Sequence, residues 1–397
     1  MMNRSFKDPV SPLSSIDHIF TGIGSYPIEF IFSYDKKLNE KDLKSSLAEI
    51  IKHFPPISSK LVKLSDHEYA FELSSEGIVF DIRNSELRFE ENYNKYEYIN
   101  PVETAEGNPL TKIRITHTPD GSVLGVSISH AIADGFSYFH FLSSWAKLFQ
   151  GKTFYPPFHQ RSLLVSKEHE GHKNPFSAEE FLNDTGLFLE GKRDVIKKED
   201  LKWESRIFDN DELKSLLSET QKYTDFRLSF NDIVTAQLSK EYLTKWQESG
   251  HRDQDYISCP VDFRRILDGF PKTYFGNAIA LATTSLDHID LESISASELA
   301  LMIRSNVKKI NKEYINTSLS ALTGLRFQKN VNVFENIHVM HPGSGLLVTN
   351  LSRLPVHEIE FNAGQPSNYS ILTQTVRGAV VLPHPSGLEV RVCCPID

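Results

Sequence analysis

The sequence predicts a two-domain α+β protein. Its 397 residues are too many for one small core, and their composition is ordinary for a folded protein. Patterns typical of helices and of strands are mixed along the chain without strict βαβ alternation, which favours sandwiches over a doubly wound parallel sheet. A polar segment at 151–205 lacks a sustained period, and a loop this long usually connects domains or carries function. We therefore expect domains at 1–150 and 206–397, joined by a connector at 151–205.

The first half begins with a helix and continues into strands. Apolar residues at helical spacing predict a helix over 38–54, which Asn39 can cap and Pro55 ends. Strands separated by Asp, Ser and Gly turn residues are expected at 60–64, 68–73 and 78–82.

A hairpin follows these strands. The turn sequence Pro-Asp-Gly at 119–121 predicts that strands 112–118 and 122–129 pair with each other. The second strand ends just before His130. Apolar residues from Phe139 to Phe149 then mark one face of a helix that Asp134 can cap.

The second half repeats this mixture of elements. Its periodic segments predict helices at 209–220 and 230–246. Apolar runs predict buried strands at 257–263, 278–286, 345–352, 378–383 and 388–394.

Charge and cysteine content narrow the class of protein. A net charge of -9 argues against a nucleic-acid partner or an anionic membrane surface. Three cysteines (Cys259, Cys393 and Cys394) make a poor disulfide framework and indicate a reducing compartment. The first twelve residues lack the apolar core of a signal peptide, and no apolar run reaches the ~18 residues that a membrane span requires. We expect a cytoplasmic protein that binds neither nucleic acid nor membrane.

The strongest candidate for chemistry is the stretch HAIADG at 130–135. A histidine at the end of a strand, just before a helix, can be held rigidly with its ring toward a cleft. Neutral imidazole accepts a proton from a hydroxyl or an amine near pH 7. The stretch also fits a structural histidine beside an ordinary Asp134 cap, so taken alone it leaves both interpretations open.

Other segments give weaker evidence for a functional site. His169 and His172 lie in a polar segment with no thiolate partner at a zinc spacing, so we expect no metal site. The sequence contains no GxSxG, Walker or CxxC motif, and GIGSYP lacks the third glycine of a dinucleotide fingerprint.

Several segments together resemble one family. HAIADG, followed by a phenylalanine-rich helix that ends in SSWA, resembles the HxxxD signature of BAHD acyltransferases. Condensation domains and chloramphenicol acetyltransferases share a related motif. HFPPISSKL, VDFRRILDGFPKTYFGN and VTNLSRLPVHEIEFNAGQP (53–61, 261–277 and 348–366) are similar to further family segments, in the family's order. The resemblance implies two chloramphenicol-acetyltransferase-like α/β sandwich domains with a channel between them.

The resemblance also implies roles for matching residues. His130 matches the family's general base. Asp134 matches an aspartate that points away from substrate and pairs with an arginine, so that it and Gly135 support the catalytic turn. Arg264 is the best match for that arginine, with Arg265 as the second choice.

The late segments match less closely. Thr349 corresponds to a threonine near the reacting carbonyl and is a candidate for oxyanion or substrate contact. Leu351 and Ala363 stand where the family has tryptophans, and Glu360 replaces the aspartate of the DFGWG motif. These departures bear on the donor and the acceptor pocket more than on the base.

We expect an acyl-CoA-dependent O- or N-acyltransferase of secondary metabolism that acts as a monomer. His130 would deprotonate a small-molecule acceptor for direct attack on the thioester in a ternary complex. Acyl-CoA would be a co-substrate, and no permanently bound cofactor is expected. One alternative is a carrier-protein-dependent condensation or ester-forming enzyme, although Ser129 stands where condensation domains usually have a second histidine. The other is a degenerate, non-catalytic ligand-binding member.

Overall fold

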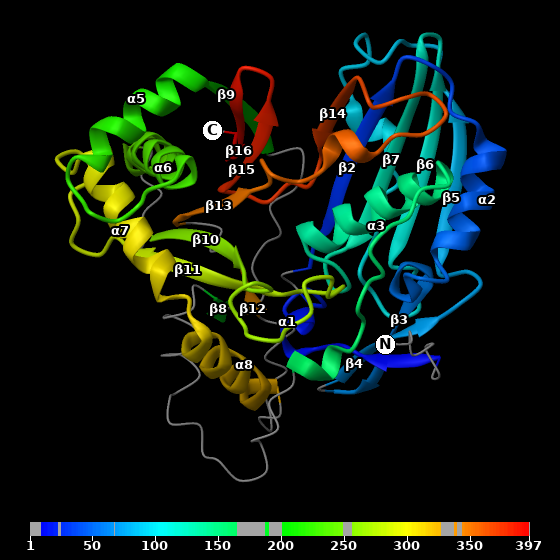
Figure 1. Cartoon of the computed structure of the whole chain (residues 1–397), viewed down its shortest axis with the longest axis horizontal. Coiled ribbons are helices and arrows are strands. Elements are labelled where there is room, and N and C mark those ends of the chain that lie inside the picture. Colours follow the sequence, from blue (N-terminus) through cyan, green and yellow to red (C-terminus); the bar gives the residue numbers. More distant parts are fainter. Residues whose placement is uncertain are drawn as a thin grey trace.

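Two mixed β-sheets, each flanked by helices, form the two parts of the molecule (Figure 1). The structure is a computed structural model of the chain. It describes residues 9–22, 25–66, 68–164, 187–189, 201–248, 256–326, 337–339 and 344–396. Within these ranges, no helix is both long and apolar enough to cross a bilayer.

The first sheet has five strands in the order β14-β2-β7-β6-β5. These are β2 (Pro27–Tyr34), β5 (Ile78–Asn84), β6 (Thr111–Thr118), β7 (Gly121–Ser129) and β14 (Asn368–Ile371). β7 lies at the centre, antiparallel to β2 and β6, and every one of its residues is buried. The residue that follows it, His130, is therefore anchored to the most enclosed strand of the sheet.

Helices α2 (Glu40–Ile50) and α3 (Gly135–Phe149) lie side by side against this sheet. Phe139 of α3 meets Phe30 of β2 edge to face, with ring centroids 5.1 Å apart. The Trp145 indole of α3 donates a hydrogen bond to the Ser46 hydroxyl of α2 at 3.0 Å. These contacts fix α3, and so its N-terminus, relative to the strand that carries His130.

Smaller elements complete this part of the molecule. A three-stranded sheet has the order β1-β4-β3. Its strands are β1 (Val10–Pro12), β3 (Ser59–Ser65) and β4 (Glu68–Leu73), with the short helix α1 (Ser15–His18) after β1. Short 3-10 turns lie at Pro55–Ser58, Lys95–Tyr98, Arg161–Leu164 and Val356–Glu358.

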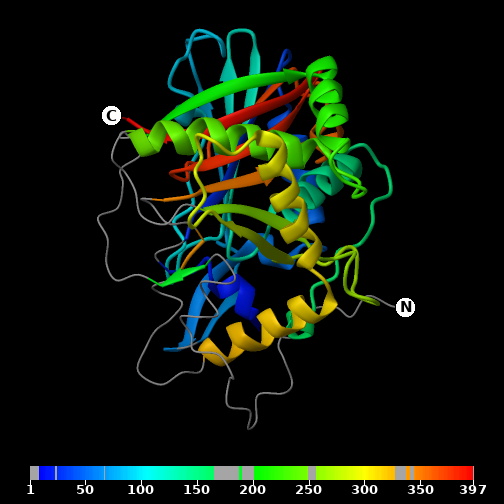
Figure 2. The same ribbon diagram turned by 90° about the vertical axis from the view of Figure 1, so that its left-hand side faces the viewer.

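The second sheet has six strands in the order β11-β10-β13-β15-β16-β9. These are β9 (Leu201–Asp209), β10 (Tyr256–Asp262), β11 (Ile279–Ser285), β13 (Leu346–Asn350), β15 (Gly378–His384) and β16 (Gly387–Pro395). Helices α5 (Asn210–Gln221), α6 (Phe230–Glu248) and α7 (Ala296–Lys309) pack on this sheet, and Figure 2 looks onto the helical layer. Helix α8 (Lys312–Arg326) instead packs against α1 of the first part.

The chain passes between the two parts more than once. β14, which comes late in the sequence, pairs antiparallel with β2 of the first sheet. β9 begins at Leu201, within the segment for which we expected a connector. The short strands β8 (Phe188–Leu189) and β12 (Ile337–His338) pair with each other. The division at 1–150, 151–205 and 206–397 stays a prediction.

Most expected elements are present. The first long helix is shorter than expected, but Asn39 caps it by accepting hydrogen bonds from the Lys41 and Asp42 amides. The hairpin of β6 and β7 has the expected turn. Besides several shorter elements, the sequence analysis missed β2, β9, α7 and α8. Of these, α7 had a readable signal, because Ser295 and Glu298 form a capping box at its start.

Candidate active site

His130 follows the last residue of β7 and begins the tight turn that leads into α3. Its backbone amide donates to the Tyr26 carbonyl at 3.3 Å. The side chains of Ala131, Ile132 and Ala133 are fully buried, so the turn is packed into the core rather than free in solution.

The imidazole of His130 is enclosed by aromatic rings. Phe20 stacks on it with ring centroids 3.8 Å apart and planes 20° from parallel. Tyr26 meets it edge-on at 5.1 Å. Only 8% of the residue is exposed, and among the described residues its buried Nδ1 has no hydrogen-bond partner. Burial lowers the pKa of His130 from 6.5 to about 4, and the nearby Asp134 charge opposes this only in part.

Asp134 both caps α3 and bonds to the segments around β10 and β11. One carboxylate oxygen caps α3 by accepting from the Ser137 amide at 2.9 Å. The other accepts from the Ala278 amide at 3.0 Å and from the Arg264 guanidinium at 2.8 Å. Burial by itself would raise the pKa of Asp134, but the Arg264 charge and these hydrogen bonds hold it below its ordinary value.

Arg264 is the arginine that pairs with Asp134, whereas Arg265 is exposed. Its guanidinium also donates to the carbonyls of Tyr274 and Gly276, at 3.0 and 2.9 Å. With the side chain 2% exposed, these contacts replace the water that the charge has lost. The pair joins the N-terminus of α3 to the segment after β10, and therefore ties the two parts of the molecule together.

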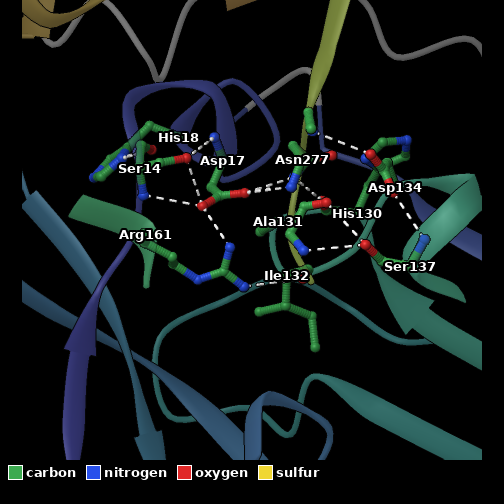
Figure 3. Close-up of polar contacts among 12 residues, drawn as sticks. Ser14, Asp17, His18, His130, Ala131, Ile132, Asp134, Ser137, Arg161 and Asn277 are labelled. Carbon is green, nitrogen blue, oxygen red and sulfur yellow. Dashed lines mark hydrogen bonds and ion pairs between the residues drawn. The ribbon is translucent and has the colours of Figure 1, made fainter. Parts of the chain in front are cut away.

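A second buried ion pair lies on the other side of the turn (Figure 3). Asp17 of α1 is fully buried and accepts from Arg161 Nη1 at 2.9 Å. Arg161 Nη2 in turn donates to the Ile132 carbonyl at 3.0 Å. Asp17 also accepts from Ser14, whose amide and hydroxyl donate at 2.9 and 2.7 Å.

Asn277 connects this second pair to the base. Its side-chain amide donates to Asp17 Oδ1 and to the His130 carbonyl, each at 2.8 Å (Figure 3). The preceding Gly276 has φ of 153°, and a Cβ there would lie 2.2 Å from Arg161 Nη1. Only glycine leaves room for the arginine to reach the turn. The carbonyls on either side of Ala131 thus accept from Asn277 and Arg161, and Asp17 holds both of these side chains.

The late strand β13 ends beside the same turn. Thr349 is partly buried on β13. Leu351 lies two residues further on, and its Cδ2 would be 3.2 Å from a Cβ added to Gly135. Gly135 therefore permits close approach of this segment to the start of α3. The role of Thr349 stays a prediction.

The DFGWG-like segment packs at the opposite end of α3. Phe361 is buried and meets Trp145 edge to face at 5.0 Å. Gln150, just after α3, donates to the Glu360 carbonyl at 2.8 Å. Ala363 packs against the core. This segment therefore stabilises the helix that Asp134 caps.

The polar segment at 151–205 holds the last two candidate residues. His169 and His172 lie outside the described residues. Across the described ranges, no group of three His, Cys, Asp or Glu residues is arranged to hold a metal ion.

Asp17 and Arg161 were missed by the sequence analysis. The spacing of Ser14 and Asp17 fits a capping box, which could have marked α1. Arg161 is 144 residues from its partner, and no local pattern distinguishes it from other arginines. Asn277 lies in the segment that resembles the family, but its contact with His130 required the structure.

Comparison with known proteins settles the family. The model of the Transferase family matches residues 6–395. The chain belongs to this family, that of the BAHD acyltransferases. The resemblance is thereby confirmed. The protein is an acyl-CoA-dependent transferase that acylates a hydroxyl or an amine.

The sequence relatives cover most of this chain, and the structural neighbours cover nearly all of it. A hydroxycinnamoyltransferase of Narcissus pseudonarcissus is 26% identical, over 82% of this chain and 76% of the relative. A hydroxycinnamoyl-CoA:5-hydroxyanthranilate N-hydroxycinnamoyltransferase of Avena sativa is 25% identical, over 82% and 76%. The structure of F. graminearum TRI101 complexed with coenzyme A and deoxynivalenol superposes with a TM-score of 0.76 at 12% identity, covering 97% of this chain and 95% of that one. The predicted two-domain α+β architecture is confirmed.

Removing Asp134 tests the first ion pair of this BAHD protein. Asp134→Ala leaves the buried Arg264 charge without its main partner, so we expect the free energy of unfolding to fall by about 3–5 kcal/mol. Activity should fall with it. Urea unfolding followed by circular dichroism gives the stability, and release of free thiol from acyl-CoA gives the activity.

Asp262→Ala is the matched control for this change. Asp262 also contacts Arg264, at 3.1 Å, but its side chain is 45% exposed. Its loss should cost less than about 1 kcal/mol. An Asp134→Ala protein with native stability and no activity would contradict a structural role for Asp134.

Proposed function

We propose that the protein transfers an acyl group from acyl-CoA to a small-molecule acceptor, with His130 as general base. The observation that carries this proposal is the neutral imidazole of His130, held at the end of β7 by networks on both sides of its turn. Family membership supplies the reaction class, and the geometry supports the identity of the base.

The low pKa of His130 keeps its ring ready to accept a proton. A pKa of about 4 means that the imidazole is neutral throughout the neutral pH range. Because Nδ1 is sealed inside the protein, we assign proton acceptance to Nε2. A base this weak takes the proton only as the acceptor oxygen or nitrogen bonds to the carbonyl carbon, when that atom becomes strongly acidic.

The transfer then balances without any further reactant. The acceptor atom attacks the thioester carbonyl, and its proton moves to His130. The tetrahedral intermediate collapses by breaking the carbon–sulfur bond, and His130 returns the proton to the departing thiolate. The products are the ester or amide and free coenzyme A. Thr349 is our candidate for hydrogen bonding to the oxyanion, a contribution typically worth ~3 kcal/mol per donor.

Acyl-CoA is the donor that we propose over a carrier-bound thioester. F. graminearum TRI101, which has this fold, was solved with coenzyme A. The condensation-enzyme alternative expects a histidine at position 129, where this chain has a fully buried serine whose hydroxyl lies 2.7 Å from that of Thr104. The non-catalytic alternative leaves unexplained why so many buried polar groups hold His130.

Replacing the base tests the proposal. His130→Ala should lower the rate of thiol release by roughly 100- to 10,000-fold, because general-base catalysis contributes about that much. Melting temperature should stay close to that of the wild type. The assay uses a panel of acyl-CoA donors with alcohols and amines. His117→Gln, which alters a histidine on β6 bonded to Ser122, controls for loss of an imidazole elsewhere. Retention of more than about a tenth of the wild-type rate would rule out His130 as the base.

Direct attack in a ternary complex is the second testable feature. Burial, with a contribution from the Asp232 charge, raises the pKa of the Cys259 thiol to about 12. Burial likewise raises the pKa of Cys393 and of Cys394 to about 12. A thiol that stays protonated is a poor nucleophile. Initial rates with both substrates varied should therefore give intersecting lines. Parallel lines, or an acyl adduct on the protein after incubation with donor alone, would contradict this mechanism.

A further inference from the structure

An apolar cavity lies between α1, β11 and α8. Its volume is about 50 Å³. α1 and α8 pack against each other here, although they come from opposite ends of the chain. The walls include Ile16 of α1, Phe20 just after it, Ala280 of β11, and Ser318 and Leu322 of α8.

The cavity and His130 are both in contact with the Phe20 ring. Phe20 lines the cavity and also stacks on His130 with centroids 3.8 Å apart. An atom in van der Waals contact with the other face of Phe20 would be ~8 Å from the imidazole. To reach the cavity, a group bonded to the reacting centre would have to pass the edge of Phe20.

The side chains that line the cavity also determine which chemical groups can bind there. None of the side chains around the cavity carries a charge. The hydroxyl of Tyr314 already donates to the Leu281 carbonyl at 3.3 Å, which leaves Ser318 as the other polar side chain in the wall. Phosphate, carboxylate and sugar groups would lose their hydration here without replacement, whereas alkyl groups and unsubstituted rings would gain from burial.

We propose that this cavity binds the apolar end of a substrate whose reactive carbon or heteroatom lies at His130. The group is an alkyl chain or ring, carried by the acyl donor or by the acceptor. This inference rests on the proposed function, and it adds the substrate class: a short apolar group beyond the reacting centre.

The size of the cavity sets the expected preference. A cavity of about 150 Å³ binds benzene, so a volume of about 50 Å³ suits only a few carbon atoms. Two methylene groups buried there should improve affinity about fifteenfold. Butanoyl-CoA should therefore bind more tightly than acetyl-CoA by about that factor if the donor supplies the group. Butan-1-ol should bind more tightly than ethanol by the same factor if the acceptor supplies the group.

Isothermal titration of these two pairs tests the proposal without requiring turnover. Ser318→Phe fills the cavity and should abolish the preference for the longer member. Thr317→Phe is the matched control, since it adds the same ring to the exposed neighbouring position of α8 and should keep the preference. Leu322→Ala enlarges the cavity and should move the optimum to hexanoyl-CoA or hexan-1-ol. If Ser318→Phe does not fold, the shift of the optimum chain length in Leu322→Ala tests the proposal instead.

The two ligand pairs identify the source of the group. If Ser318→Phe abolishes the preference only between the two thioesters, the cavity binds the acyl chain. If it abolishes the preference only between the two alcohols, the cavity binds part of the acceptor. Equal affinity within both pairs in the wild type would overturn the proposal, and so would preferences that neither Ser318→Phe nor Leu322→Ala changes. Failure of thiol release with every substrate pair would instead contradict the proposed function, and the binding result would still stand.

Discussion

The buried ion pair between Asp134 and Arg264 is the contact on which the catalytic turn depends. Asp134 caps α3 from inside the first part of the molecule, and Arg264 reaches it from the segment that follows β10. Two charges removed from water in this way are costly unless every lone pair and proton finds a partner. Here Ser137, Ala278 and the carbonyl of Gly276 supply those partners. The pair therefore couples the turn, the start of α3 and the interface between the two parts.

The Asp17–Arg161 pair repeats the arrangement on the other side of His130. Its contacts end on the carbonyls of His130 and Ile132, the former through Asn277. The backbone is thus constrained from two directions while the ring lies against Phe20 and Tyr26. Lowering the pKa of His130 from 6.5 to about 4 corresponds to about 3 kcal/mol in favour of the neutral ring. Rigid placement and the neutral state have one cause, which is the close packing around the turn.

Local chemistry explains which features could be predicted from sequence. The turn at 119–121 fixed the hairpin, and Asn39 and Asp134 were recognisable as helix caps because a cap acts within three residues of itself. The resemblance led to Arg264, 130 residues from Asp134, which no local rule could have done. Arg161 had neither kind of signal, and the capping-box spacing of Ser14 and Asp17 marked only the start of α1, not the contact with Arg161. β14 was missed because nothing in its own sequence shows that its partner is β2, more than 300 residues earlier.

The pKa of His130 in the folded protein tests the central claim most directly. The imidazole 13Cε1 resonance can be assigned by its absence in His130→Gln and followed by NMR from pH 8 downward. The ring is charged below its pKa, so the account predicts that the signal stays at its neutral position through pH 6 and shifts only as pH approaches about 4. A titration midpoint near 6.5 in the folded protein would show that the ring is well hydrated and would contradict the account.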